Sequence, residues 1–282
     1  MIRYVLKRLL MLIPIIFGIT FIVFFILSLT PGDPARMILG SNATPAQVEM
    51  MREQMGLNDP VLLRYVKYMG GVLVGDFGTS WSTREPVFQI VFARFPYTLQ
   101  LAILSMVVTV AVSIPLGIYS AVKQNTAADG AVMVLSMVLA ATPKFWLGIL
   151  MMLVFSVWLR WLPTSGLVSW KSYIMPTIAM AAASTAINTR IVRASVLDVI
   201  KQDYIRTARA KGVKEKVIFR KHALKNALLP VVTVMGMSFA SALGGSVLIE
   251  NVFSIPGIGL LMIERIRQKD IPSVLACVIF IA

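Results

Sequence analysis

The stretch Leu9–Thr30, LLMLIPIIFGITFIVFFILSLT, decides the fold because it contains no charged residue. A membrane-spanning helix needs about 20 apolar residues, and this run exceeds the 7–15 residues of the apolar core of a signal peptide. No small-residue cleavage site follows the run, which ends at Pro31-Gly32-Asp33-Pro34, where the two prolines cannot continue a helix. We therefore expect an uncleaved first transmembrane helix.

The composition of the whole chain supports a membrane protein. Of the 282 residues, 57% are hydrophobic and only 14% are charged, whereas a soluble domain carries about 25% charged residues. Cys277 and His222 are the only cysteine and histidine. A disulfide within the chain and a His/Cys metal site in the chain are therefore excluded.

Further long runs without charge predict an all-α protein with six transmembrane helices. Four more spans are complete, at Phe95–Val122, Gly130–Leu159 (interrupted only by Lys144), Ser172–Thr189 and Asn226–Ile249. The sixth run, Ile271–Ala282, would form only about 18 Å of helix, against a hydrocarbon core of about 30 Å. We expect the natural chain to continue past Ala282.

The distribution of basic residues predicts the orientation in the membrane. If the N-terminus lies in the cytoplasm, the inner segments carry 15 of the 27 lysines and arginines, and the outer segments contain nearly balanced charges. Cytoplasmic segments of membrane proteins are enriched in basic residues. The net charge of +14 is thus explained by topology, and it gives no indication of nucleic-acid binding.

The spans divide the chain into three parts. Residues 1–30 are the N-terminus and first helix, residues 31–96 are an external cap, and residues 97–282 are a core of five helices. In the cap, Thr44-Pro45-Ala46-Gln47 is typical of a capped helix start. Further helices are expected from Val61 to about Met69 and from Pro86 to Phe95. The cap either packs on the spans or contacts an external partner.

The segment from residue 190 to 226 is longer than a connection between two spans requires. Its pattern predicts a helix over Ser195–Lys211, a break at Gly212 and a second amphipathic piece over Lys214–Lys225. We interpret it as a helix-turn-helix that projects into the cytoplasm. A DNA-binding role is disfavoured because both arms continue into spans. A basic helix lying on anionic lipid is the alternative.

Two polar residues within the spans are candidates for the translocation path. Lys144 is the only charged residue well inside a span and follows Pro143, which is expected to kink the helix. It would help an anionic solute across, unless it pairs with a carbonyl between subunits. Asn188 lies near the inner end of the fourth span, beside an alanine run, Ala179–Ala186, that favours close helix packing.

The projecting segment resembles a known element. Residues 203–212, DYIRTARAKG, followed by NALLP at 226–230, are similar to the cytoplasmic EAA loop of permease subunits in bacterial ABC importers. Arg206 and Thr207 stand where the general consensus has Glu and Ala, and the spacing between the two motifs is longer. Both departures resemble the peptide and nickel branch, as do three further segments, PGDPA at 31–35, GDFG at 75–78 and ENVFSIPGIG at 250–259.

The resemblance implies that the loop docks in a groove of a cytoplasmic ATPase. The residues of this coupling element would be Asp203, Tyr204, Arg206, Thr207, Ala208, Arg209, Ala210, Lys211 and Gly212. The chain has no GxxxxGK[ST] phosphate loop. We therefore expect a transport subunit that is not itself an enzyme and holds no cofactor, with ATP and Mg²⁺ bound by one or two partner ATPase subunits.

The resemblance also implies a second homologous permease subunit, an external solute-binding protein and a location in the bacterial cytoplasmic membrane. The expected function is import of short peptides or of nickel and similar metal chelates. The outer connection Arg160–Ile174 and the stretch Ala186–Asp198 look more like nickel-type or glutathione-type members. A stand-alone secondary transporter or channel is the alternative, although no internal repeat is evident. A membrane enzyme ranks third.

Overall fold

The computed structural model describes residues 2–40, 42–214, 217–218 and 223–282, and in these residues the chain is helical, with a single isolated β-bridge between Thr79 and Pro86. This confirms the predicted all-α class. The chain forms two compact units. Unit 1 comprises Met1–Tyr97 and Pro256–Ala282, and unit 2 comprises Thr98–Ile255.

Unit 1 contains the first helix and most of the short ones. Its helices are α1 (Ile2–Leu29), α2 (Pro34–Leu39), α3 (Pro45–Gln54), α4 (Val61–Leu73), the start of α5 (Val87–Val122), α12 (Ile258–Arg267) and α13 (Ile271–Ile281). The predicted capping box is confirmed, because the Thr44 side chain accepts from the Gln47 backbone N–H while the Gln47 side chain accepts from that of Thr44. The helix predicted to begin at Val61 extends beyond Met69, to Leu73.

The prediction of a separate helix from Pro86 to Phe95 is wrong about where that helix ends. The residues are helical, but α5 continues through them without a break to Val122, over 36 residues. No glycine or left-handed residue separates the two segments, and Pro96 is accommodated inside the helix. The boundary between the two compact units falls within this helix, between Tyr97 and Thr98.

The inside of unit 1 combines apolar packing with a buried carboxylate. Tyr65 of α4 packs against Phe24 of α1 and donates a hydrogen bond of 2.7 Å to the Phe17 carbonyl. The fully buried Asp270 carboxylate accepts hydrogen bonds from the hydroxyls of Ser80 and Ser82 and from the Trp81 N–H. These contacts fix the loop between α4 and α5 to the turn before α13.

Unit 2 is assembled around one helix, α8 (Ile174–Ile200). The other elements are the rest of α5, then α6 (Ala127–Ala141), α7 (Lys144–Met151), η1 (Met152–Trp158), η2 (Trp170–Tyr173), α9 (Asp203–Ala210) and α11 (Leu224–Phe253). Helix α8 packs against α6, α7 and α11. Ala179, Ala181 and Ala186 are buried, which agrees with the predicted packing role of the alanine run.

Within the described part of the chain, three helices are long and apolar enough to cross a membrane, and the number rises to five if two interrupted pairs each count as one span. The three are Leu6–Leu29, Val87–Val122 and Leu224–Gly244. The interrupted pairs are Ala127–Ala141 with Lys144–Trp158, and Ser246–Phe253 with Ile258–Arg267. The predicted fourth span forms part of α8 but is not among these candidates. Asn188 and Arg190 reduce its hydropathy, and neighbouring helices bury much of its surface.

The predicted third span is not one kinked helix. It is broken at Thr142-Pro143, and the two parts are bent by 100°. Pro143 lacks the N–H needed to continue the helical ladder, and the residue before a proline is disfavoured in the helical conformation. Thr142 accordingly adopts an extended conformation. Lys144 therefore lies in the first turn of α7, not in the middle of a continuous helix.

Helices α5 and α8 are packed so tightly at Gly117 that one added methyl group should destabilise the protein. A Cβ atom at Gly117 would lie 2.6 Å from the Val192 Cβ and 2.7 Å from the Thr189 carbonyl oxygen, whereas one at Gly18 would meet no atom within 4 Å. Gly117→Ala should therefore lower the free energy of unfolding by about 1–3 kcal/mol. Thermal unfolding in detergent checks this, with Gly18→Ala as the matched control; equal midpoints for the two variants would contradict the packing.

Candidate functional site

The nine residues predicted as the coupling element lie on and just after α9. Helix α8 ends at Ile200, residues 201–202 form a turn, and α9 runs from Asp203 to Ala210. The prediction of one helix over Ser195–Lys211 is therefore wrong, because the chain turns before Asp203. The break at Gly212 is confirmed: Gly212 has a φ of +74°, a left-handed conformation that glycine adopts without strain.

The sequence of α9 suits a short, exposed helix. Asp203 lies in its first turn and Arg209 in its last, which places each charge at the helix end whose partial charge attracts it. The Thr207 hydroxyl donates to the Asp203 carbonyl at 2.9 Å. Half of the second predicted piece, Lys214–Lys225, lies outside the described residues, including Glu215 and His222.

One apolar residue holds α9 against the rest of the unit. Ile205 is fully buried and packs with Ile218 and Ala223, and Val199 and Ile200 of α8 lie against this cluster. The Asn226 side-chain amide donates to the Tyr204 hydroxyl at 2.9 Å, which links α9 to the start of α11. The sequence analysis identified neither Ile205 nor Asn226 as a residue that holds α9, because their partners include residues more than ten positions away.

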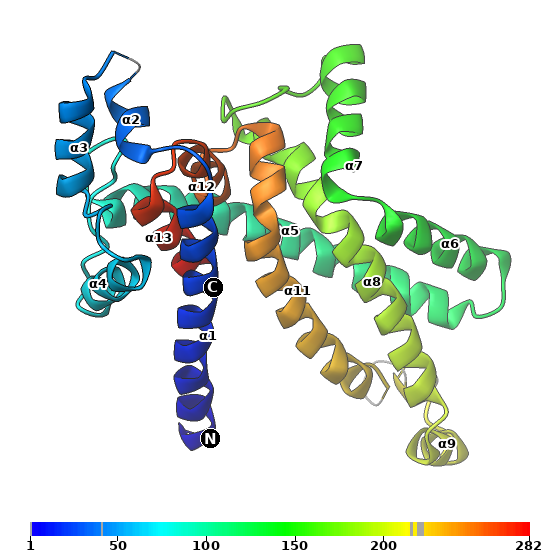
Figure 1. Cartoon of the computed structure of the whole chain (residues 1–282). Coiled ribbons are helices and arrows are strands. Elements are labelled where there is room, and N and C mark those ends of the chain that lie inside the picture. The colour runs from blue at the N-terminus through cyan, green and yellow to red at the C-terminus, as the bar shows by residue number, and fades with distance from the viewer. Residues whose placement is uncertain (1, 41, 215–216, 219–222) are drawn as a thin grey trace. The chain divides into compact units, whose positions relative to one another are not determined.

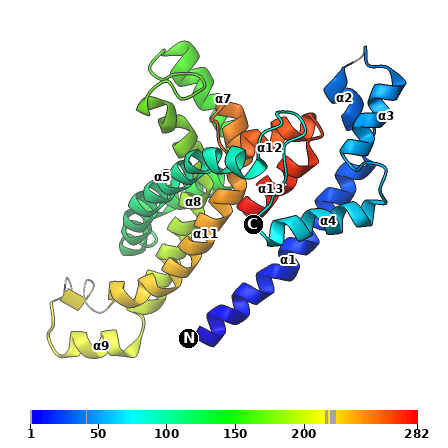
Figure 2. The same ribbon diagram turned by 90° about the vertical axis from the view of Figure 1, so that its left-hand side faces the viewer.

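The opposite surface of α9 is exposed and rich in cations. Arg206 pairs with Asp203 at 3.4 Å, but both side chains remain largely exposed, so the pair adds little stability. Arg209, Ala210 and Lys211 are also exposed, and Ala208 is partly buried. Figures 1 and 2 show α9 beyond the ends of α8 and α11, at the end of unit 2 away from α7. The helix thus presents a positive surface with small residues between its charges.

A buried ion pair fixes the helix from which α9 extends. Arg193 of α8 donates two hydrogen bonds of 2.7 Å to the two carboxylate oxygens of Asp129, in the first turn of α6. The carboxylate also accepts from the Ser120 hydroxyl and the Asn125 N–H. On the other side, the Ser195 hydroxyl donates to the Ala227 carbonyl of α11 at 2.7 Å. Helix α8 is therefore held on two sides within its last three turns.

The two candidates for the translocation path occupy different environments. Lys144 is partly buried, and no hydrogen bond or ion pair joins it to a residue in the described ranges. Asn188 is fully buried: its amide nitrogen donates to the Ser184 carbonyl at 2.8 Å and to the Ser238 hydroxyl of α11 at 3.1 Å. Its Oδ1 atom has no hydrogen-bond partner among the residues that the structure covers. The Asn188 side chain thus lies at the contact between its own helix, α8, and α11.

Comparison with known families gives two matches that together cover nearly all of the chain. Residues 113–282 match the family described as "Binding-protein-dependent transport system inner membrane component". Residues 1–102 match the family described as "Binding-prot-dependent transport system membrane comp, N-term".

Individual relatives are similar over almost the full length. The glutathione transport system permease protein GsiC of Salmonella paratyphi A is 44% identical over 276 residues, which cover 98% of this chain and 90% of the relative. GsiC of Escherichia coli strain K12 has the same identity and coverage.

Among solved structures, the crystal structure of an amino acid ABC transporter with histidines has a TM-score of 0.51 and 16% identity. The match covers 68% of this chain and 87% of that one, and at this identity it supports the fold alone.

Proposed function

The chain belongs to the family of binding-protein-dependent transport system inner membrane components, and on this basis we propose that it is the permease subunit of an ATP-driven importer. The observation that carries the proposal is the exposed cationic helix α9, held against the rest of unit 2 by Ile205 and by the Asn226–Tyr204 hydrogen bond. Such an element can bind a partner through its charges and transmit that partner's movement to the helices behind it.

The proposed arrangement has six spans in the bacterial cytoplasmic membrane, with the N-terminus and α9 on the cytoplasmic side. The excess of lysine and arginine in segments 1–8 and 190–225 supports this orientation. Residues 31–96 would then form the external cap, and residues 97–282 the permease core with the coupling loop 190–226. Helix α8 would serve as the fourth span, since a helix buried among its neighbours needs less apolar surface than one surrounded by lipid.

The proposed partners follow from this arrangement. Helix α9 binds in a groove of a cytoplasmic ATPase, and one or two such ATPase subunits bind ATP and Mg²⁺. A second homologous permease forms the other half of the path, and an external solute-binding protein delivers the solute to the cap. This chain holds no cofactor of its own.

The proposed solute class is short peptides, with glutathione as the specific candidate. The support is the 44% identity to GsiC, whose name states glutathione transport. Import of nickel or another metal chelate, the other predicted function, has less support, because the names of these GsiC relatives state glutathione transport.

Reversing the charge of α9 tests the coupling role. Arg206→Glu with Arg209→Glu should reduce ATP-dependent uptake of glutathione roughly tenfold or more, since like charges juxtaposed at an interface cost several kcal/mol. Because both residues are exposed and exposed charges contribute little to stability, the thermal stability of the chain should change only slightly. The measurement is uptake and ATPase activity of the complex reconstituted with its partner permease, ATPase and binding protein.

Lys123→Glu is the matched control for this pair, because Lys123 lies in another exposed turn of the predicted cytoplasmic side. Wild-type uptake by the α9 variant would contradict the proposal. Movement of solute by the purified chain alone, without ATP, would replace it with the secondary-transporter alternative.

Lys144 is proposed to assist an anionic solute on its path, because ionisable residues within spans are rare and line such paths. Lys144→Met should lower uptake of glutathione several-fold while leaving basal ATPase activity intact. Lys171→Met, at an exposed lysine of η2, serves as the control and should leave uptake unaltered. Equal uptake by both variants would exclude the role.

A further inference from the structure

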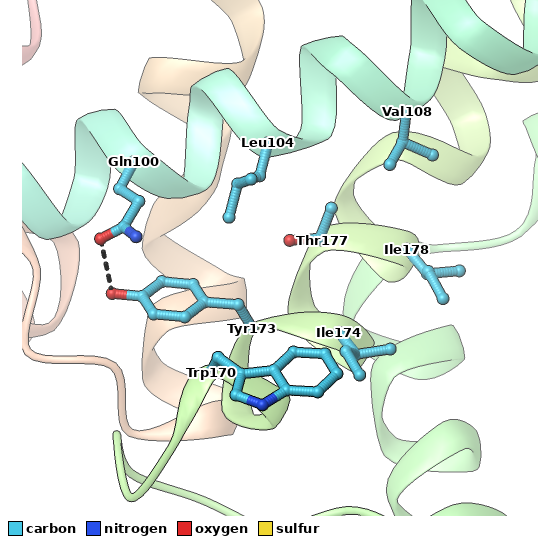
Figure 3. A pocket seen from close by; sticks show the side chains of 8 residues that line it. All are labelled: Gln100, Leu104, Val108, Trp170, Tyr173, Ile174, Thr177 and Ile178. Atoms are coloured by element: carbon cyan, nitrogen blue, oxygen red, sulfur yellow. Dashed lines mark hydrogen bonds between the residues drawn. The ribbon is translucent and has the colours of Figure 1, made fainter.

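A cavity of about 440 Å³ lies between α5, η2 and α8 of unit 2 (Figure 3). This volume falls within the range of about 300–1,000 Å³ that is typical of small-molecule sites. The cavity is lined by Gln100, Leu104, Val108, Trp170, Tyr173, Ile174, Thr177 and Ile178. None of these residues is charged, and the walls are mainly aliphatic and aromatic.

One buried hydroxyl group in the wall of the cavity has no partner among the described residues. Thr177 is only 7% exposed, and its Oγ1 atom makes no hydrogen bond to any residue that the structure describes. Within helices, threonine usually bonds to the carbonyl four residues earlier, as Thr189 of the same helix does to Thr185 at 2.7 Å. In Figure 3 the Thr177 oxygen points into the space between Leu104 and the Tyr173 ring.

The other polar groups lie together on one side of the cavity. The Tyr173 hydroxyl is 3.0 Å from the Gln100 Oε1 atom and donates to it, which orients the Gln100 amide (Figure 3). Gln100 also carries an NH₂ group with two donors. Trp170 is 73% exposed and lies beside Tyr173. Donors and acceptors thus lie on two sides of an otherwise apolar space.

These features define the chemistry of an occupant. A lipid chain would fill the apolar volume but would leave the buried Thr177 hydroxyl unsatisfied, which is unfavourable. A charged group would find no counter-ion among the lining residues. A neutral group with its own hydrogen-bonding atoms needs no counter-ion and can bond to the Thr177 hydroxyl. Most ligand pockets have this character, with apolar walls around a few polar groups.

We infer that this cavity binds an uncharged side chain of a short peptide during transport, with the adjoining peptide group hydrogen-bonded to Thr177 and Gln100. Charged ends of the peptide remain outside the cavity. The inference rests on the proposed import function and adds to it a specific contact for the solute.

Removing the hydroxyl tests the contact without changing the side-chain shape. Thr177→Val in the complete reconstituted complex should raise the KM for uptake of glutathione and of the tripeptide Gly-Leu-Gly about fivefold, since one hydrogen bond is lost. Thr189→Val is the matched control, because the Thr189 hydroxyl is satisfied within its own helix. Equal KM values for the two variants would overturn the assignment.

A second measurement does not depend on transport by a Thr177 variant. Gln100→Cys in the complex should react with N-ethylmaleimide, and saturating glutathione with the binding protein should slow the reaction at least about threefold, because occupied pockets bury most of the ligand-facing surface. Ile103→Cys, on α5 but outside the cavity lining, should show no protection. The native Cys277 is buried, and the unmodified chain sets the background.

Each other outcome contradicts the inference. Labelling of Gln100→Cys that solute does not affect would indicate a lipid-filled cavity. Labelling of the isolated chain but not of the complex, with or without solute, would indicate that the partner permease covers it. If the wild-type complex shows no ATP-dependent uptake, the proposed function itself fails; if uptake is normal and both measurements are negative, only the cavity assignment fails.

Discussion

The ion pair between Asp129 and Arg193 is the interaction on which the C-terminal part of unit 2 depends. Two hydrogen bonds of 2.7 Å join the guanidinium to the carboxylate, which is nearly inaccessible to solvent. The Arg193 side chain is partly exposed, and removing it would leave the Asp129 carboxylate without its counter-ion. The pair fixes the last turns of α8 to α6. Because α9 begins three residues after α8 ends, a displacement of α9 would act on a helix that this ion pair holds to α6.

Helix α8 also shows how polar residues are accommodated in the interior of unit 2 of a membrane protein. Helix α8 contains Asn188, Thr189 and Arg193, and all three lie against other helices and not on an open face. Hydrogen bonds and close packing replace the apolar surface that lipid would require. The approach of α5 at Gly117 leaves no room for a methyl group. The cavity beside Thr177 lies between α8 and α5, and α5 is the helix that approaches α8 closely at Gly117.

Features that depend on local sequence were predictable, and features that depend on distant residues were not. The apolar runs predicted the all-helical class, Thr44 and Gln47 predicted the start of α3, and Gly212 predicted the end of the α9 segment. The continuity of α5 was missed because the sequence of its first turns also fits a separate short helix. The 100° break before Lys144 exceeded the expected kink, since proline indicates a disruption but not its angle. In the candidate site, the Asp129–Arg193 pair joins residues 64 positions apart, and no local pattern encodes such a contact.

We propose that α9 binds an ATPase, and cross-linking can detect this contact directly. A photo-reactive maleimide is attached to Ala210→Cys, which is exposed on α9, in membranes that contain all subunits of the complex. Lys123→Cys provides the comparison, and Cys277 is buried. We predict that the α9 probe cross-links to an ATPase subunit and that the yield changes when ATP is added. Cross-linking to lipid alone, with no ATPase product under either condition, would contradict the proposed contact.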